Sequence, residues 1–523
     1  MGSAQGDPPD VRWPVGAAIG VLSGAVAIGT ATLAAGLIGT GTAPVLAVGA
    51  AAVDASPEWL KRFAINTFGT DDKTALLLGI AIVLTIAAVV LGIVSLRRPR
   101  AGIIGLIVLG TIGALAAVTR PANGLLAAVP SFAGTAAGLW AYVWLRGRAG
   151  LSPIVERTEA DAEPAVPAGL DRRRFLFGGV VVAGLALAPG FVGEYLVRRS
   201  EASASRSAVR LPSVADTGKP TPAGADLDVP GEIPFITPND AFYRVDTALF
   251  VPAVQTDGWT LTIHGMVDTP MTLDFDQLIA RPLIERDVTL CCVSNEVGGH
   301  YIGNARWTGT LLAPLLQEAG IRAGVTQLVS RSTDGFTTGT PASVALDGRD
   351  AMLVVAMNGE PLPLQHGFPV RMVIPGLYGY ESACKWITDI EATTYEAYSA
   401  YWVERGWAEQ VLIKTESRID VPKRGASVPA GPVTVAGIAW AQHRGISAVD
   451  IQIDTGPWGP AKLGAQDTID TWRQWRYDWQ APAGPHTITV RATDGDGQVQ
   501  TSAVAPPFPS GATGLHQIDV TVT

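Results

Sequence analysis

Five apolar stretches in the first 200 residues constrain this chain more than any other feature of its sequence. They occupy residues 16–40, 75–96, 102–119, 124–145 and 175–197, and only the last contains a charged residue, Glu194. A helix of about 20 apolar residues is long enough to cross a lipid bilayer. The sequence therefore predicts a helical transmembrane region over 1–199 with about five spans. The hydrophobic fraction of the whole chain, 48%, agrees with a protein that lies partly in lipid.

Arginine clusters beside these stretches predict how the chain crosses the membrane. They lie between the second and third stretches, after the fourth and before the fifth, at residues 97–100, 146–148 and 172–174. Because basic loops remain in the cytoplasm, an internal amino terminus places all three clusters inside, and five spans then deliver the carboxy-terminal region to the outside. We therefore predict a multi-pass protein of the cell membrane, with the region after residue 200 on the extracytoplasmic side.

The segment DRRRFLFGGVVVAGLALAPG, residues 171–190, resembles a twin-arginine export signal, with Arg172 and Arg173 paired before an apolar run. That pathway exports folded proteins, which implies that a cofactor is inserted before transport. The alternative interpretation is an ordinary span with a basic flank.

The spans themselves indicate packing rather than transport. Charged residues within spans are the usual mark of a transport or proton path, and the first four spans contain none. All six histidines lie beyond the last span. Gly16, Gly20 and Gly24 form a stripe of small residues that suits helix packing or a homo-oligomer. The segment 41–73 predicts an interfacial or re-entrant helix. A net charge of −9 without a basic block argues against a nucleic-acid partner.

The region after the spans divides by its pattern into three parts. Residues 200–230 are rich in Ser, Ala, Pro, Gly and Asp without periodicity, which predicts a linker. Residues 231–410 mix short strand-like and helix-like segments, which is typical of a compact α+β domain. Residues 424–523 contain alternating strands alone, at roughly ten-residue intervals, which predicts an immunoglobulin-like sandwich with buried tryptophans.

The stretch TLCCVSNEVGG, residues 289–299, holds two of the three cysteines in the chain, Cys291 and Cys292. Adjacent cysteines can bond each other only with strain. A structural disulfide is therefore the weaker explanation of the pair.

The motifs of the 231–410 region follow a familiar order: CVSN at 292–295, NARWTGTLLAPLLQEAG at 304–320 and MNGEPLPLQHGFPVRMVIPGLYGYESACKW at 357–386. Together they resemble the catalytic domain of the sulfite oxidase family of molybdopterin enzymes, and the tail resembles the sandwich domain that follows it there. The resemblance implies a molybdenum-molybdopterin cofactor and makes Cys292 the protein ligand to the metal. Cys291 would then point to the other face of the strand as a small buried hydrophobe, and Cys384 is interpreted likewise.

The resemblance also implies which residues hold the cofactor. His366 and Arg371 would hold the pterin and its phosphate, and Lys385 with the backbone of Gly379, Tyr380 and Glu381 would complete the cradle. TPNDAFYR at 237–244 resembles the first cofactor-binding loop, so Asn239, Asp240 and Tyr243 are weaker candidates.

The residues around the substrate depart from the family pattern. Sulfite-oxidising members carry arginines after the cysteine turn and before the lysine, where this chain has Glu296 and GYES at 379–382. Arg244 and Arg306 would supply positive charge in their place.

The predicted function is a membrane-anchored oxidoreductase that transfers an oxygen atom to or from a small substrate outside the cytoplasm in a two-electron reaction. Since the chain has no C-x-x-C-H motif for a c-type haem, electrons would pass to a separate carrier or to quinone. The alternatives are a reductase of S-oxides or N-oxides on the same cofactor, and a metal-free binding or scaffold protein that retains the fold.

Overall fold

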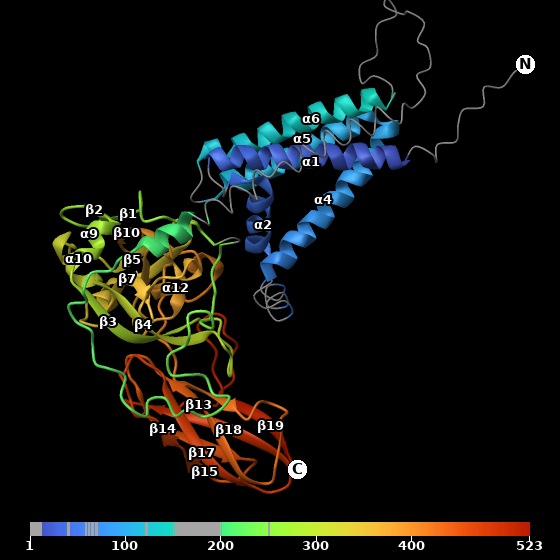
Figure 1. The fold of residues 1–523 in the computed structure, drawn as a ribbon. Helices are drawn as coiled ribbons and strands as arrows, with labels where there is room; N and C mark the ends of the chain where they lie inside the picture. Colours follow the sequence, from blue (N-terminus) through green and yellow to red (C-terminus); the bar gives the residue numbers. More distant parts are fainter. Residues whose placement is uncertain are drawn as a thin grey trace, which may run out of the picture. The chain divides into compact units, whose positions relative to one another are not determined.

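The computed structural model describes residues 13–38, 42–57, 72–120, 124–149, 201–248 and 251–523, with the single residues 60, 63, 67, 151 and 199. The chain forms two compact units, Met1–Arg199 and Ser200–Thr523. Figure 1 colours the helical first unit blue and the second unit green to red. The predicted fifth span at 175–197 and the twin-arginine motif lie outside the described residues.

Four of the five predicted spans are helices long and apolar enough to cross a membrane: Trp13–Gly36, Ala75–Arg97, Pro99–Val118 and Leu125–Arg148. They belong to α1 (Trp13–Ile38), α4 (Asp72–Arg97), α5 (Pro99–Val118), and η4 (Leu125–Ala128) with α6 (Val129–Arg148). A shorter apolar helix, α2 (Pro44–Ala55), lies within the segment predicted as an interfacial or re-entrant helix.

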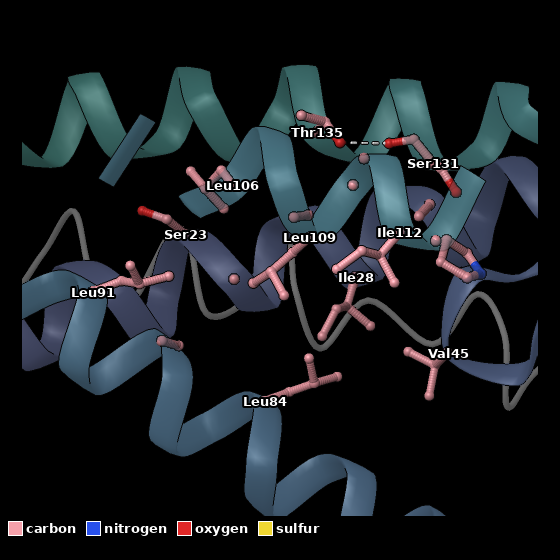
Figure 2. Close-up of a pocket in the computed structure, with 18 of the residues that line it drawn as sticks. Ser23, Ile28, Val45, Leu84, Leu91, Leu106, Leu109, Ile112, Ser131 and Thr135 are labelled. Atoms are coloured by element: carbon pink, nitrogen blue, oxygen red, sulfur yellow. Dashed lines mark hydrogen bonds between the residues drawn. The ribbon is translucent and has the colours of Figure 1, made fainter. Parts of the chain in front are cut away.

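The predicted glycine stripe on α1 lies against α4. A Cβ atom on Gly20 would lie 1.9 Å from the carbonyl oxygen of Ala88, and one on Gly92 would lie 2.1 Å from that of Gly16. The two backbones therefore approach as closely as only glycine permits. An apolar cavity of about 190 Å³ lies among the helices of the first unit, and none of the described residues that line it is acidic or basic. Figure 2 shows most of the residues that line it.

The first domain of the second unit contains two five-stranded sheets. One has the order β2-β1-β10-β5-β6, in which only β1 and β10 pair in parallel, and the other has the order β3-β4-β7-β8 with β9 on β7. The main apolar core includes Leu261 and Ile263 of β1 and Leu353 and Val355 of β7, so both sheets contribute to it. The elements are β1 (Thr260–Gly265), β2 (Met271–Asp274), α9 (Phe275–Ile279), β3 (Leu283–Cys291), β4 (Ile302–Leu311), α10 (Leu312–Glu318), β5 (Gln327–Ser332), β6 (Thr337–Pro341), α11 (Ala342–Ala345), β7 (Met352–Met357), β8 (Glu360–Pro361), η6 (Leu364–His366), β9 (Arg371–Val373), α12 (Gly379–Ser382), β10 (Ile387–Thr393) and η7 (Val403–Arg405).

The C-terminal domain is all β, as predicted. Its sheets have the orders β11-β13-β17-β16 and β12-β19-β18-β14-β15, and residues of both, including Val435, Trp475, Ile488 and Val520, form one core. The first strand lies before the predicted boundary at residue 424. The strands are β11 (Glu416–Val421), β12 (Ser427–Val428), β13 (Gly431–Trp440), β14 (Ile446–Ile453), β15 (Trp458–Pro460), β16 (Lys462–Leu463), β17 (Arg473–Ala481), β18 (Gly484–Asp494) and β19 (His516–Val522).

The predicted linker at 200–230 packs on the first domain. Residues 201–208 are helical, and the irregular chain that follows pairs with β3. Ala215 donates its N–H to the carbonyl of Leu283 at 2.8 Å, and Glu285 donates to the carbonyl of Asp216 at 2.8 Å. An edge strand leaves backbone groups unpaired, and this segment satisfies them. The linker prediction is corrected accordingly.

Candidate active site

Cys292, the predicted metal ligand, directly follows β3 and begins a loop that returns to β4. Its N–H donates to the carbonyl of Tyr301 at 2.9 Å, and its carbonyl accepts from the N–H of Asn295 at 3.0 Å. Asn295 Oδ1 accepts from the N–H of Tyr301 at 2.8 Å. The Cys292 sulfur lies 2.9 Å from Ser294 Oγ, and the residue as a whole is partly exposed. The loop therefore presents this thiol in a fixed position, with a hydroxyl beside it.

The other two cysteines have different surroundings. Cys291 is 1% exposed and packs with Phe235, Val293 and Tyr378 in an apolar cluster. Cys384 is buried in the main core of the domain. Burial raises the pKa of both thiols, so both stay protonated at neutral pH. Burial also raises the pKa of the Cys292 thiol, but the hydrogen bond from Ser294 and the charge of Lys385 oppose that shift.

Arg371 begins strand β9 and is buried. Its guanidinium lies 5.0 Å from the centre of the Trp307 ring, and its Nη1 donates to the carbonyl of His366 at 3.2 Å. Its Nε has no hydrogen-bond partner among the described residues. Burial lowers the pKa of Arg371 to about 10, which records the cost of placing this charge where water cannot solvate it.

His366 ends the short helix η6, and its Nε2 lies 3.0 Å from the carbonyl oxygen of Asn239. Burial, followed by the charges of Arg371 and Lys385, lowers its pKa to about 3. The ring is therefore neutral at physiological pH. Because Nε2 faces a carbonyl oxygen, this nitrogen carries the proton and Nδ1 remains an acceptor.

Lys385 shares one buried carboxylate with Arg244. Lys385 Nζ and Arg244 Nε both donate to Asp246 Oδ2 at 2.8 Å, and the Asp246 side chain is 3% exposed. Burial lowers the pKa of Lys385 to about 8 despite this partner. Asp246 is a residue that the sequence prediction missed, since it lies outside the recognised motifs. Its position two residues after Arg244 is the only sequence signal for it.

Tyr243 and Gly379 bring two further segments to the cysteine. A Cβ atom on Gly379 would lie 3.7 Å from the carbonyl oxygen of Cys291 and 3.9 Å from the Tyr243 hydroxyl. Burial, and then the charge of a Cys292 thiolate, raise the pKa of Tyr243 well above its ordinary value, so the hydroxyl remains a donor. The structure thus brings together Tyr243, Cys292, His366, Arg371, Gly379 and Lys385, with Arg244 beside Lys385.

The side chains of Asn239 and Asp240, the weaker cofactor-binding candidates, have different surroundings. The Asn239 side chain bonds the turn after β7, since its Oδ1 accepts from the Asn358 side-chain Nδ2 at 2.8 Å and its Nδ2 donates to the carbonyl of Met357 at 3.3 Å. Its carbonyl holds His366, which makes Asn239 a support for that ring. Asp240 is exposed.

Tyr380 and Glu381 direct their side chains away from the cysteine. The Tyr380 hydroxyl donates to the carbonyl of Ala408 at 2.6 Å, and Glu381 Oε1 accepts from the N–H of Val411 at 2.9 Å. Burial raises the pKa of Glu381 to about 8. The N–H of Glu381 donates to the carbonyl of Tyr378 at 2.9 Å, and its carbonyl accepts from Thr340 Oγ1. The cofactor-binding role of the Tyr380 and Glu381 backbone stays a prediction.

Arg306 is not brought to this cluster. Side chains alternate along β4, and Trp307 faces Arg371, so Arg306 points to the opposite face of the sheet. There its Nε and Nη2 each donate to a different oxygen of Asp287, both at 2.8 Å. The prediction of Arg306 as a residue that acts on the substrate is corrected on this ground.

The donors of the cluster fit a phosphate-bearing cofactor. Arg371, Lys385 and Arg244 bring three cations to the site, and Lys385 and Arg244 pair with the same carboxylate, Asp246. Arg371 Nε and buried Asn295 Nδ2, which find no hydrogen-bond partner in the described part of the chain, supply donors that an anionic or polar ligand would satisfy. The partly exposed Cys292 supplies the soft sulfur donor that suits molybdenum, the metal expected from the sequence.

The chain is similar in sequence to known molybdopterin-binding oxidoreductases. A family model described as "Oxidoreductase molybdopterin binding domain" matches residues 248–402. Mitochondrial sulfite oxidase of Homo sapiens is 32% identical over 321 residues, which cover 52% of this chain and 58% of that protein. The "Uncharacterized oxidoreductase YuiH" of Bacillus subtilis (strain 168) is 34% identical over 149 residues, which cover 28% of this chain and 72% of that protein.

Among solved structures, the sulfane dehydrogenase SoxCD from Paracoccus pantotrophus aligns with a TM-score of 0.46 and 23% identity, over 51% of this chain and 75% of that chain. The chain spans 58% of the length of the human sulfite oxidase that it matches. The molybdopterin-binding model covers the domain that contains Cys292 and the buried cations, and YuiH is matched over 72% of its length. This chain therefore belongs to the sulfite oxidase family of molybdopterin-dependent oxidoreductases, and its cofactor is molybdenum held by molybdopterin.

Proposed function

We propose that this protein is a membrane-anchored oxidoreductase that transfers an oxygen atom to or from a small substrate on the extracytoplasmic side of the cell membrane. The observation that carries the proposal is the convergence of a partly exposed thiol, Cys292, with the buried cations Arg371 and Lys385. When bound, molybdenum supplies the two-electron oxygen-atom chemistry. The protein supplies the metal ligand, the cofactor cradle and the charges around the substrate.

Each residue of the site has a proposed role. Cys292 binds the metal as a thiolate, and the charge of Lys385 and the hydrogen bond from Ser294 favour that form. Arg371, Lys385 and neutral His366 hold the pterin and its phosphate, and the Gly379 backbone leaves room for it. Arg244, whose side chain is 35% exposed, is the cation left to attract an anionic substrate.

The apolar helices anchor the enzyme, and the arginine clusters at 97–100 and 146–148 keep those two loops in the cytoplasm. The predicted fifth span at 175–197 then delivers the second unit to the outside. Electrons pass to a separate carrier or to quinone. The C-terminal two-sheet domain is proposed to be immunoglobulin-like. A homo-oligomer would use a surface other than the glycine stripe of α1, because that stripe packs against α4 of the same chain. A reporter enzyme fused after Thr523 is expected to be active only outside the cytoplasm.

A second candidate function is reduction of S-oxides or N-oxides on the same cofactor. Two departures from the family pattern favour it: Glu296 is exposed directly after the cysteine turn, and the segment 379–382 has no arginine where sulfite-oxidising relatives carry one. Fewer cations favour a neutral substrate over a small oxyanion.

Artificial redox dyes decide between the two directions. The full chain, purified in detergent, is assayed for sulfite oxidation with an oxidised dye and for reduction of sulfoxides and N-oxides with a reduced dye. Arg244→Met is expected to raise KM for sulfite far more than for a neutral sulfoxide. Loss of both activities in Cys292→Ser is expected, and a wild-type chain that contains molybdenum yet shows neither activity would count against the proposal.

A further inference from the structure

The C-terminal domain holds strand β3 at Thr289, three residues before Cys292. The Thr289 N–H donates to the carbonyl of Asp470 at 3.0 Å, and the Thr289 carbonyl accepts from Gln442 Nε2 at 3.1 Å. Its hydroxyl accepts from the N–H of Trp472 at 2.8 Å and donates to Asn304 Oδ1 at 3.0 Å. Every polar group of Thr289 therefore has a hydrogen-bond partner. Asp470, Gln442 and Trp472 all belong to the C-terminal domain.

The residues that make these contacts are buried. Thr289 is 1% exposed, Gln442 0% and Trp472 1%. β3 lies at the edge of its sheet, so its outer backbone groups have no strand to pair with, and the second domain satisfies them at this residue. A buried hydrogen bond of this kind cannot be exchanged for one to solvent without opening the domain interface.

The same domain holds the loop after Cys292. Arg418 Nη1 donates to the carbonyl of Gly299 at 2.8 Å. The guanidinium is fixed by Asp420, to which its Nε donates at 2.9 Å, and the two side chains are 7% and 9% exposed. Gly299 in turn donates its N–H to the carbonyl of Glu296 at 2.7 Å. A rigid, buried arginine is thus tied to the loop of the cysteine.

His516 supports the neighbouring residue of that loop. A Cβ atom on Gly298 would lie 2.2 Å from His516 Cδ2, so the ring and the loop backbone are in direct contact. The ring is held in place because its Nδ1 accepts from the N–H of Ile419 at 3.0 Å. The second domain therefore contacts the loop through two residues of different strands, β11 and β19.

We infer that the C-terminal domain positions the Cys292 thiol by holding the chain on both sides of it, at Thr289 and at Gly299. This inference rests on the proposed role of Cys292 as the metal ligand. Thr289 and Arg418 are positioning residues that act through the backbone of the cysteine loop.

Reactivity of the thiol tests the inference without the cofactor. The full chain is purified in detergent from cells unable to make molybdopterin, and alkylation of Cys292 by iodoacetamide is followed by mass spectrometry, with buried Cys384 as the internal reference. Arg418→Gln removes the donor to Gly299. Thr289→Val removes the hydroxyl that accepts from the N–H of Trp472, at nearly constant side-chain volume. This variant can be measured even if Arg418→Gln does not fold.

Arg444→Gln is the matched control. Arg444 pairs with buried Asp494 at 3.0 Å in the same domain, and it donates to Ile413 and Thr415 instead of the cysteine loop. Loss of a hydrogen bond to a charged or fully buried group corresponds to roughly a tenfold or larger rise in the fraction of molecules whose cysteine loop has detached from the C-terminal domain. The alkylation rate of Cys292 is expected to rise by about that factor in both test variants and to change less than about twofold in the control.

Two results would overturn the inference: an unchanged Cys292 rate in Thr289→Val, or an equal rise in the Arg444→Gln control. Failure of the proposed function has a separate signature, because a wild-type chain without molybdenum would leave the difference in alkylation intact. Molybdenum content of the loaded variants provides a second readout, and it is expected to fall in Arg418→Gln and Thr289→Val but not in the control.

Discussion

Gly298→Ala is expected to damage the cysteine loop through two separate effects. Gly298 has φ +75°, a conformation that is unfavourable for a residue with a Cβ by about 1–2 kcal/mol. The added methyl would lie 2.2 Å from His516 Cδ2 and 2.4 Å from its Nε2. The ring cannot rotate away freely, because Ile419 holds its Nδ1 and it is 9% exposed. Forced overpacking of this kind costs about 1–3 kcal/mol, so the total loss is about 2–5 kcal/mol.

Gly224→Ala separates the two effects. Gly224 has φ +82°, and no heavy atom lies within 4 Å of the place its Cβ would take, so only the backbone penalty of about 1–2 kcal/mol applies. In Gly298→Ala, a second substitution, His516→Ala, is expected to recover the overpacking part, which would appear as a coupling energy of about 1–3 kcal/mol in a double-mutant cycle.

The assay is urea unfolding of the full chain in detergent, followed by tryptophan fluorescence, with molybdenum content measured on the same preparations. We expect Gly298→Ala to lose more stability than Gly224→Ala and also to lose metal, because the displaced loop contains Cys292. Equal losses in the two variants, or additivity with His516→Ala, would refute the contact between the loop and the C-terminal domain.

Three further predictions concern the candidate site. Arg371→Met removes the buried cation proposed to face the cofactor phosphate, so pterin content after acid extraction is expected to fall at least about tenfold; normal content would remove Arg371 from the cradle. Cys291→Ala deletes a thiol that packs away from the site, so molybdenum content should stay at the wild-type level while stability falls by about 1 kcal/mol; loss of metal would contradict the assignment of Cys292. Burial raises the pKa of Glu381 from 4.5 to about 8, so the folded protein keeps a proton that the unfolded chain loses, and stability falls as pH rises through that window. Glu381→Gln is expected to flatten this part of the Tm profile between pH 4.5 and 8, and an unchanged slope would assign the titration to another group.

Local pattern was sufficient for the helices and strands. Uncharged runs predicted the four described spans, because a bilayer imposes length and hydropathy on a helix regardless of its neighbours. Alternating apolar residues predicted the strands, including the one that ends in Cys291 and leads to Cys292. The order of several motifs then supplied the chemistry, which no single motif would have done.

Contacts between distant segments could not be predicted in the same way. The direction of Arg306 depends on which face of β4 meets Arg371, and that depends on how β9 and β4 both pair with β7. Asp246 is recognisable as a site residue only when Lys385, 139 positions later, is seen to contact it. The segment at 200–230 has a composition typical of linkers. Pairing with an edge strand requires no apolar pattern, since it uses hydrogen bonds between backbone groups.

Molybdenum and pterin content of the purified full chain, wild type beside Cys292→Ser, tests the central claim most directly. We expect about one molybdenum and one pterin per wild-type chain. We also expect loss of the metal, or an altered spectrum of the metal site, in the variant, since serine replaces a soft sulfur donor with a hard oxygen. A wild-type chain without molybdenum, expressed in cells with an intact cofactor pathway, would contradict the account and favour a binding protein that retains the fold.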